Sequence, residues 1–173
     1  RAEVSLGLIH YHFESKKGLL ESSLEFIEGP LLDLEPEHLD RVRAGEDLGD
    51  VMTEAYLDAF GRIRDQRALM RIILILVGQG GGLPRRWREG SLHAFLERWT
   101  EAIVEQTDAD PTEVRFRLHN VLALTTRYIA SSEAELRTVL GRPDASLDQV
   151  RDHLVAQVRA MADRWVAAAP RGD

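Results

Sequence analysis

Hydrophobic residues recur every three or four positions along most of this 173-residue chain. That period is typical of amphipathic helices, in which one side faces a core. It is clearest from Leu48 to Ile63, where the apolar residues share one helical face. Nowhere do apolar and polar residues alternate as they do in a half-buried strand. The pattern therefore predicts an all-α fold.

Capping residues divide this pattern into separate helices. Asp110, Ser132 and Ser146 each stand directly before a periodic segment and are followed three positions later by Glu or Gln. A short polar side chain before a helix accepts a hydrogen bond from a free N–H of the first turn. Asp65 is expected to cap a further helix, and Gly29-Pro30, Gly78 to Gly82, and Gly141 are expected to end helices. The expected helices cover residues 6–12, 16–28, 48–63, 66–77, 84–106, 111–131, 133–140 and 147–168, with residues 31–45 partly helical.

The beginning of the chain contains two short helix starts. Ser5 is suited to cap a helix over residues 6–12, and Ser15 caps the next helix, which begins at Lys16. A helix of less than two turns is unstable alone, so neighbouring helices must hold it. Val4, Ile9 and Phe13 can face those neighbours, which turns the other residues of the segment outward. Small, aromatic and imidazole side chains on an exposed short helix indicate a contact surface.

The same residues carry a resemblance to a known family. Residues 2–20 read Ala-x-Val-Ser-x-Gly-Leu-Ile-x-Tyr-His-Phe-x-Ser-Lys-x-x-Leu-Leu. This stretch resembles the end of the helix-turn-helix in the Tet-repressor family of prokaryotic transcription regulators, and the rest of the chain resembles the family only in being helical. Glu3 stands where the family usually has glycine, and His10 where it usually has tyrosine. The resemblance implies that the first helix and most of the second precede Arg1.

The resemblance also implies a division of the chain and a set of DNA contacts. Residues 1–28 would be the remainder of a helix-turn-helix domain, and residues 29–173 an effector-binding and dimerisation domain. Four residues would lie near base edges, and four would contact phosphates, which fixes the position of the protein without reading the DNA sequence. The first four are Leu6, Gly7, Leu8 and His10, and the second four are Ser5, Tyr11, His12 and Lys16. The alternative is that His10 and His12 are ordinary surface residues; they do not suit a metal, because positions two apart on a helix do not face each other.

The charge of the chain does not by itself favour DNA. The formal net charge is −7 at pH 7, although residues 1–20 carry three basic and two acidic side chains, a net of +1. Phosphate contact depends on the charges within about 10 Å rather than on the sum over the chain. The first twenty residues are therefore only a weak basic patch.

The two long helices near the end are apolar beyond a single stripe. A second strip contains Phe116, Ala123, Leu124 and Tyr128 in the first helix, and Val155, Ala162 and Val166 in the last. A partner subunit could cover the additional surface in a four-helix interface about a twofold axis, or both helices could be central to one core. The resemblance favours a homodimer through these helices. The expected interface residues are Leu118, Leu122, Thr125, Ile129, Leu154, Val158, Met161 and Trp165.

The helical body contains enough aromatic and sulfur-bearing side chains to line an apolar pocket for a small-molecule effector. Each of them could equally be an ordinary core residue. His119 and Asn120, among apolar neighbours at helical spacing, could orient a polar group of the effector or make structural hydrogen bonds. The expected pocket residues are Met52, Tyr56, Phe60, Met70, Trp87, Phe95, Trp99, Phe116, His119, Asn120 and Tyr128.

Several functions find no support in the sequence. It contains no cysteine and no phosphate-binding glycine loop, and we predict no Glu-x-x-His pair on an inward face, so we expect no catalytic site, cofactor or metal. Its longest apolar run, Ile72 to Val77, is too short to span a membrane, and without a signal peptide a cytoplasmic location is expected. The resemblance implies a repressor that a small, largely apolar effector releases from a palindromic operator. The alternative is an all-α small-molecule-binding protein that does not bind DNA.

Overall fold

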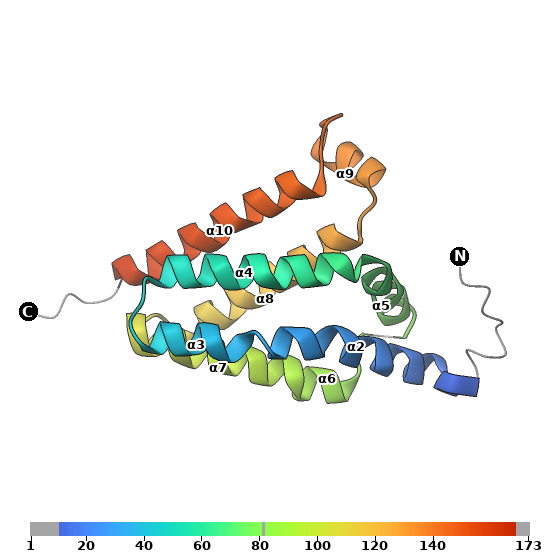
Figure 1. Ribbon diagram of the computed structural model, residues 1–173, viewed down its shortest axis with the longest axis horizontal. Coiled ribbons are helices and arrows are strands. Elements are labelled where there is room, and N and C mark those ends of the chain that lie inside the picture. The colour runs from blue at the N-terminus through green and yellow to red at the C-terminus, as the bar shows by residue number, and fades with distance from the viewer. Residues whose placement is uncertain (1–10, 81, 169–173) are drawn as a thin grey trace, which may run out of the picture.

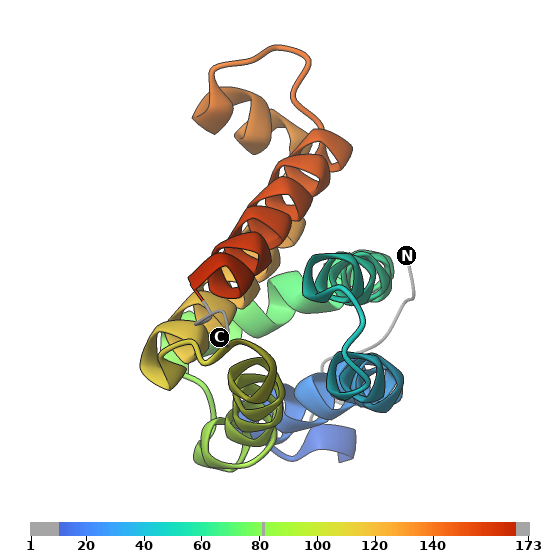
Figure 2. The same ribbon diagram turned by 90° about the vertical axis from the view of Figure 1, so that its left-hand side faces the viewer.

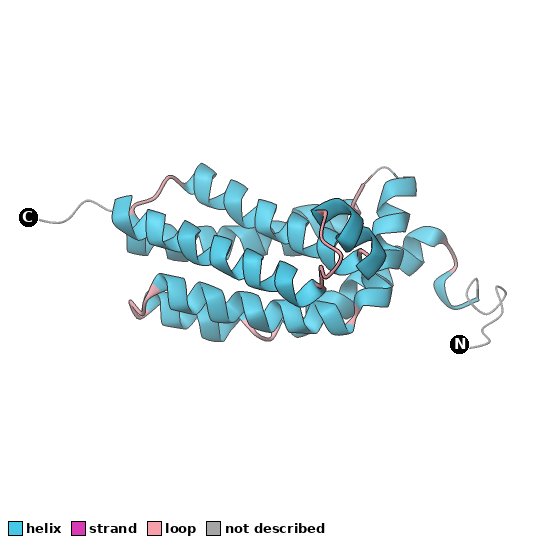
Figure 3. Cartoon of the chain, turned by 90° about the horizontal axis from the view of Figure 1, so that it is seen from above, coloured by secondary structure: helices cyan, strands magenta, loops and turns pink. Residues whose placement is uncertain are grey.

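The structure is a computed structural model, and it describes residues 11–80 and 82–168. Within these ranges the chain forms helices joined by short loops and contains no strand, which confirms the all-α prediction (Figure 3). The helices are α2 (Lys16–Leu32), α3 (Glu35–Arg43), α4 (Leu48–Asp65), α5 (Arg67–Gly80), α6 (Arg85–Glu89), α7 (Ser91–Thr107), α8 (Pro111–Ala130), α9 (Glu133–Leu140) and α10 (Leu147–Ala168).

The capping residues begin helices where the sequence predicts. The Asp47 carboxylate accepts a hydrogen bond from the N–H of Asp50 at 2.9 Å, at the start of α4. Equivalent bonds from the third residue of the helix reach Asp110 at α8 (2.8 Å), Ser132 at α9 (3.1 Å) and Ser146 at α10 (3.3 Å). Each bond satisfies one of the N–H groups that a first helical turn leaves free. These four helix starts are therefore confirmed.

Three predicted helix boundaries are wrong. Helix α2 continues through Gly29-Pro30 to Leu32, because its packing against α3, α4 and α5 outweighs the hydrogen bond that proline cannot donate. The predicted domain boundary after residue 28 therefore falls inside a helix. Asp65 is the last residue of α4 rather than a cap for α5. The helix expected over residues 84–106 divides at Gly90 into α6 and α7.

The helices pack around one apolar core (Figure 1). Helix α10 lies along α4, and α7 packs against α8 and α3, while α5 packs against both α2 and α8. Helix α2 begins at the end of the molecule opposite the end of α10 (Figure 1). The short α9 stands away from the other helices, with Leu136 buried and Val139 exposed (Figure 2). The described part of α2 is thus continuous with the helical body.

A buried ion pair connects α3 to α7. The Glu35 side chain is 5% exposed and accepts hydrogen bonds from two nitrogens of Arg98, one of them Nε at 3.1 Å. The Arg98 side chain is 39% exposed, so water still reaches part of its guanidinium. The hydrogen bonds to Glu35 raise the pKa of Arg98 above its ordinary value. The carboxylate of Glu35 consequently depends on Arg98 for compensation of its charge.

Arg159 fastens α10 to the start of α4. Its guanidinium lies 3.2 Å from the Asp47 carboxylate, bonds Asp50, and donates to Asp163 of its own helix at 3.1 Å. A β-carbon at Gly49 would lie 2.5 Å from Nε of Arg159. The arginine can lie across the first turn of α4 only because residue 49 has no side chain.

Candidate functional site

The described chain begins with a sharp corner between two helical segments. Residues 11–13 are helical, and Glu14 turns the backbone with a φ of 54°. The N–H of Ser15 then donates to the Phe13 carbonyl, and the Ser15 hydroxyl accepts from the N–H of Gly18 at 3.1 Å. The predicted cap at Ser15 is therefore confirmed. The helix predicted over residues 6–12 falls mostly outside the described residues, as do the predicted DNA contacts Ser5, Leu6, Gly7, Leu8 and His10.

The predicted DNA contacts that the structure describes all lie on the surface. Tyr11 is 80% exposed, and His12 and Lys16 are also exposed. The His12 ring packs edge-on to the Tyr11 ring, with centroids 5.3 Å apart and planes at 79°. Lys16 opens α2, where free backbone N–H groups and the helix dipole favour an anion. The corner thus presents a phenol, an imidazole and an ammonium group to solvent.

Gly18 lets the first turn of α2 approach the corner closely. A β-carbon at this position would lie 2.2 Å from the carbonyl oxygen of Phe13, far inside van der Waals contact. The oxygen belongs to the backbone, so it can yield only if the corner itself moves. The angle between the segment before Glu14 and α2 therefore depends on glycine at position 18.

Replacing Gly18 with alanine is expected to loosen this corner. The Phe13 carbonyl has to move away from the new methyl group, at a cost of about 1–3 kcal/mol. Amide hydrogen exchange should therefore become faster at the start of α2. The matched control is Gly61→Ala in α4, where no atom lies within 4 Å of the new β-carbon. That change should stabilise its helix by about 0.5–1 kcal/mol, and the same response at both positions would contradict the described corner.

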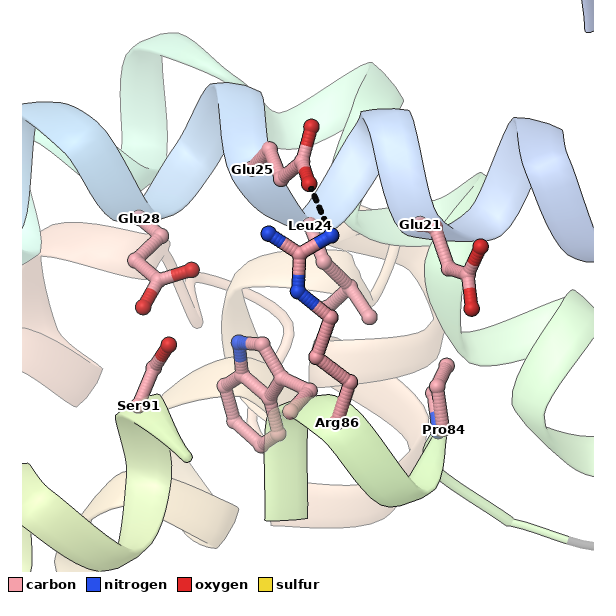
Figure 4. Close-up of a pocket in the computed structure, with 8 residues that line it drawn as sticks. Glu21, Leu24, Glu25, Glu28, Pro84, Arg86 and Ser91 are labelled. Atoms are coloured by element: carbon pink, nitrogen blue, oxygen red, sulfur yellow. Dashed lines mark ion pairs between the residues drawn. The ribbon is translucent and has the colours of Figure 1, made fainter. Parts of the chain in front are cut away.

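An acidic crevice lies further along α2, where α6 packs beside it (Figure 4). The carboxylates of Glu21, Glu25 and Glu28 line it, and the Arg86 guanidinium lies 3.1 Å from Glu25. Trp87 also lines the crevice, and its Nε1 is buried without a hydrogen-bond partner. The acidic groups give the middle of α2 a negative surface. A polyanion would consequently meet α2 at its first turn rather than at its middle.

The predicted pocket residues separate into three groups. Met52, Tyr56, Phe60, Met70 and Trp99 are buried in the core, and Trp87, Phe95 and Tyr128 are partly buried. The prediction is wrong for Phe116, His119 and Asn120, which are exposed on α8, because the apolar neighbours at helical spacing lie on the outer side of that helix. The buried and the partly buried residues therefore remain candidates for an internal site.

Polar atoms accompany the buried aromatic residues. The Tyr56 hydroxyl lies 3.1 Å from the Thr125 hydroxyl, which donates to the Val121 carbonyl at 2.7 Å. Burial raises the pKa of Tyr56 to about 12, so the phenol keeps its proton at neutral pH. Trp99 Nε1 and Thr100 Oγ1 on α7 are buried without a partner. The body therefore contains donors that a bound acceptor group or water could satisfy.

The predicted dimer interface lies on the wrong face of both helices. Seven of the eight predicted side chains are buried inside the single chain, where they contact its own core: Leu118, Thr125, Ile129, Leu154, Val158, Met161 and Trp165. Leu122 is partly buried and packs against the same core. A partner could not reach these residues without opening the fold. Thr125 instead bonds Tyr56, a role that its polar group in an apolar stripe could have suggested.

The other face of the same helices leaves apolar side chains in solvent. Phe116 is 65% exposed, and Leu124 of α8 and Val166 of α10 are also exposed. Val155 of α10 is partly buried. These residues belong to the second apolar strip predicted from the sequence, but that prediction is wrong for Ala162, which is buried in the core, and for Tyr128, which is partly buried against it. We call Phe116, Leu124, Val155 and Val166 the outer strip.

The prediction that no Glu-x-x-His pair faces inward is wrong, because Glu35 and His38 are both buried on α3. In residues 11–80 and 82–168, however, no group of three or more His, Asp or Glu side chains is arranged to hold a metal ion. No helix in these ranges has the length and apolarity needed to cross a membrane. Comparisons with protein-family models, curated proteins and solved structures find no match to the chain.

Proposed function

We propose that this chain is a DNA-binding transcription regulator that responds to a small-molecule effector and acts as a homodimer. The observation that supports it best is the corner at residues 11–18. Its sequence resembles the end of a Tet-repressor helix-turn-helix, and Tyr11, His12 and Lys16 extend from it into solvent. The tight contact at Gly18 gives this exposed segment a defined angle to α2.

The chemistry of the corner suits phosphate contacts. The Tyr11 hydroxyl and the Lys16 ammonium group can both donate to phosphate oxygens. The first turn of α2 adds a positive helix end, with Lys16 as its first residue. The base-reading part of the contact is assigned to Leu6, Gly7, Leu8 and His10 by the resemblance alone.

A dimer would give the corner a second copy on the same duplex. Two recognition helices related by a twofold axis read half-sites roughly 34–36 Å apart, which accounts for a palindromic operator. The outer strip of α8 and α10 provides an exposed apolar surface for a twofold interface. The proposed dimer therefore retains the two helices expected from the sequence but uses their opposite face.

The helical body would hold the effector. Buried aromatic side chains and the unpartnered donors of Trp99 and Thr100 favour a small, mostly apolar molecule with at least one acceptor group. Such a molecule would release the operator if it bound more tightly to a second conformation of the dimer, in which the two α2 helices are separated by a distance that does not fit the operator. The coupling between two such sites is typically about 1–3 kcal/mol.

DNA binding by the full-length chain tests this function. An operator would first be selected from a library of random duplexes, and its affinity measured against salt concentration. Lys16→Ala is expected to weaken binding about tenfold and to reduce the salt slope by about one, because one phosphate contact is lost. Tyr11→Ala should also weaken binding, with both variants still forming dimers.

The matched control is Arg164→Ala, which removes an exposed cation from α10 at the other end of the molecule. Its affinity and salt slope should equal those of the unmodified chain. Failure to select any duplex, or binding without salt dependence, would overturn the proposal. That result would favour an all-α small-molecule-binding protein without DNA binding.

A further inference from the structure

Two arginines of α5 satisfy the carboxyl end of α8. Nε of Arg71 donates to the carbonyl oxygen of Ala130 at 2.7 Å, and a terminal nitrogen of Arg67 donates to the carbonyl oxygen of Ser131. Ala130 and Ser131 are both buried, so water cannot easily replace these donors. The last carbonyls of a helix have no partner within it, and its negative end favours cations. The two guanidinium groups therefore donate to the free carbonyls and also place positive charge at the negative end of α8.

Helix α8 satisfies the neighbouring carbonyls itself. The Ser131 hydroxyl donates to the Arg127 carbonyl at 3.1 Å, and the Ser131 N–H donates to the Tyr128 carbonyl at 3.1 Å. The Arg127 guanidinium bonds the Ser131 hydroxyl and reaches Glu135 of α9. At this end of α8, the donors from Arg67 and Arg71 therefore come from a different helix, α5. Without these two side chains, the buried carbonyls of Ala130 and Ser131 would lose these hydrogen bonds.

The position of α5 affects the position of α2. Arg67 and Arg71 are four residues apart, so they lie on one side of α5. The same helix also packs against α2, and Met70 and Ile73 of α5 share a buried core with Leu20 and Leu24 of α2. Figure 1 shows α5 crossing the end of the molecule near the first half of α2. A change in the contact of α5 with α8 would consequently be felt by α2.

We propose that Arg67 and Arg71 latch α5 to the end of α8 and thereby set the position of α2 relative to α8. The significance of this latch rests on the proposed function. In a dimer built on α8 and α10, the position of α2 relative to α8 fixes the separation of the two N-terminal corners. The latch is then a conformational device that keeps the two DNA-contacting segments in register.

The latch can be tested without knowing the effector or the operator. The sequence has no cysteine, so Ser22→Cys on α2 and Thr112→Cys on α8 would be the only labelling sites in the sequence, and both positions are exposed. Pulsed electron paramagnetic resonance on spin-labelled protein, diluted with unlabelled protein, measures the distance between them within one chain. In Arg67→Met/Arg71→Met protein, the mean distance should shift by about 2 Å or more, or the distribution should broaden clearly.

The matched control is Arg62→Met, which removes an exposed arginine from α4 and should leave the distribution unchanged. Circular dichroism would establish that each variant is folded; if the double variant is not, Arg71→Met alone is measured in its place. A folded latch variant with the unmodified distribution would overturn the proposal. Sedimentation of the unmodified protein tests the dimer separately, so a monomer would refute the proposed function and leave the test of the latch within one chain intact.

Discussion

Replacing Phe116 with aspartate is expected to convert the protein from a dimer to a monomer without changing its fold. The ring is 65% exposed in the single chain, so the core loses nothing when it is removed. In the proposed interface, the same ring would be buried and the new carboxylate would lose its water. A central residue of this kind is worth about 3 kcal/mol, which raises the dissociation constant about a hundredfold. Sedimentation velocity over a range of concentrations measures this change.

Val139→Asp is the matched control for Phe116→Asp. Val139 is 67% exposed, but it lies on α9, outside the outer strip. The same loss of apolar surface at this position should leave the dimer intact. A monomeric unmodified protein, or a dimer that tolerates aspartate at position 116, would show that the outer strip of α8 and α10 is not the interface.

Replacing Arg98 with methionine is expected to lower the free energy of unfolding by about 2–3 kcal/mol, because the Glu35 carboxylate would remain buried without a partner. This expected loss of stability is smaller than the loss for a fully buried ion pair, because part of the Arg98 guanidinium is exposed to water. Chemical denaturation monitored by circular dichroism measures the loss. The double variant Glu35→Leu/Arg98→Met should recover most of it, since no buried charge then remains.

Arg85→Met is the control for an exposed ion pair. Arg85 bonds Glu89 one turn later on α6, and both side chains are largely in solvent. Its removal should change the free energy of unfolding by less than about 0.5 kcal/mol. Equal effects at Arg85 and Arg98 would mean that Glu35 does not depend on its partner.

Helix starts could be predicted from the sequence because a cap is a local interaction. Asp110 and Ser132 accept hydrogen bonds from residues three positions later, so neither depends on the rest of the fold. Helix ends were harder to predict. Pro30 lies inside α2, where the contacts with α3, α4 and α5 hold the helix together across it. Such contacts are not visible in a single stretch of sequence.

The faces of α8 and α10 show a second limit. Periodicity identifies two apolar strips on each helix, but it does not rank them. Ile129 and Leu154 turn toward the chain's own core, whereas Phe116 and Leu124 face solvent, and that choice depends on where α4, α5 and α7 lie. The contacts of Arg67 and Arg71 with α8 are likewise invisible in sequence, because they join residues about sixty positions apart. Long-range geometry, rather than local preference, decides these features.

The arginine that lies across the first turn of α4 makes residues 49 and 159 a single unit of variation. A side chain at position 49 would displace the Arg159 guanidinium and weaken its contacts with Asp47 and Asp50 together, at little cost because the end of a partly exposed arginine can move into solvent. A change at position 49 therefore acts through position 159, and a smaller residue at position 159 would remove the reason for glycine at position 49. In a set of diverged homologues, residues larger than glycine at position 49 are therefore expected more often where position 159 is not arginine.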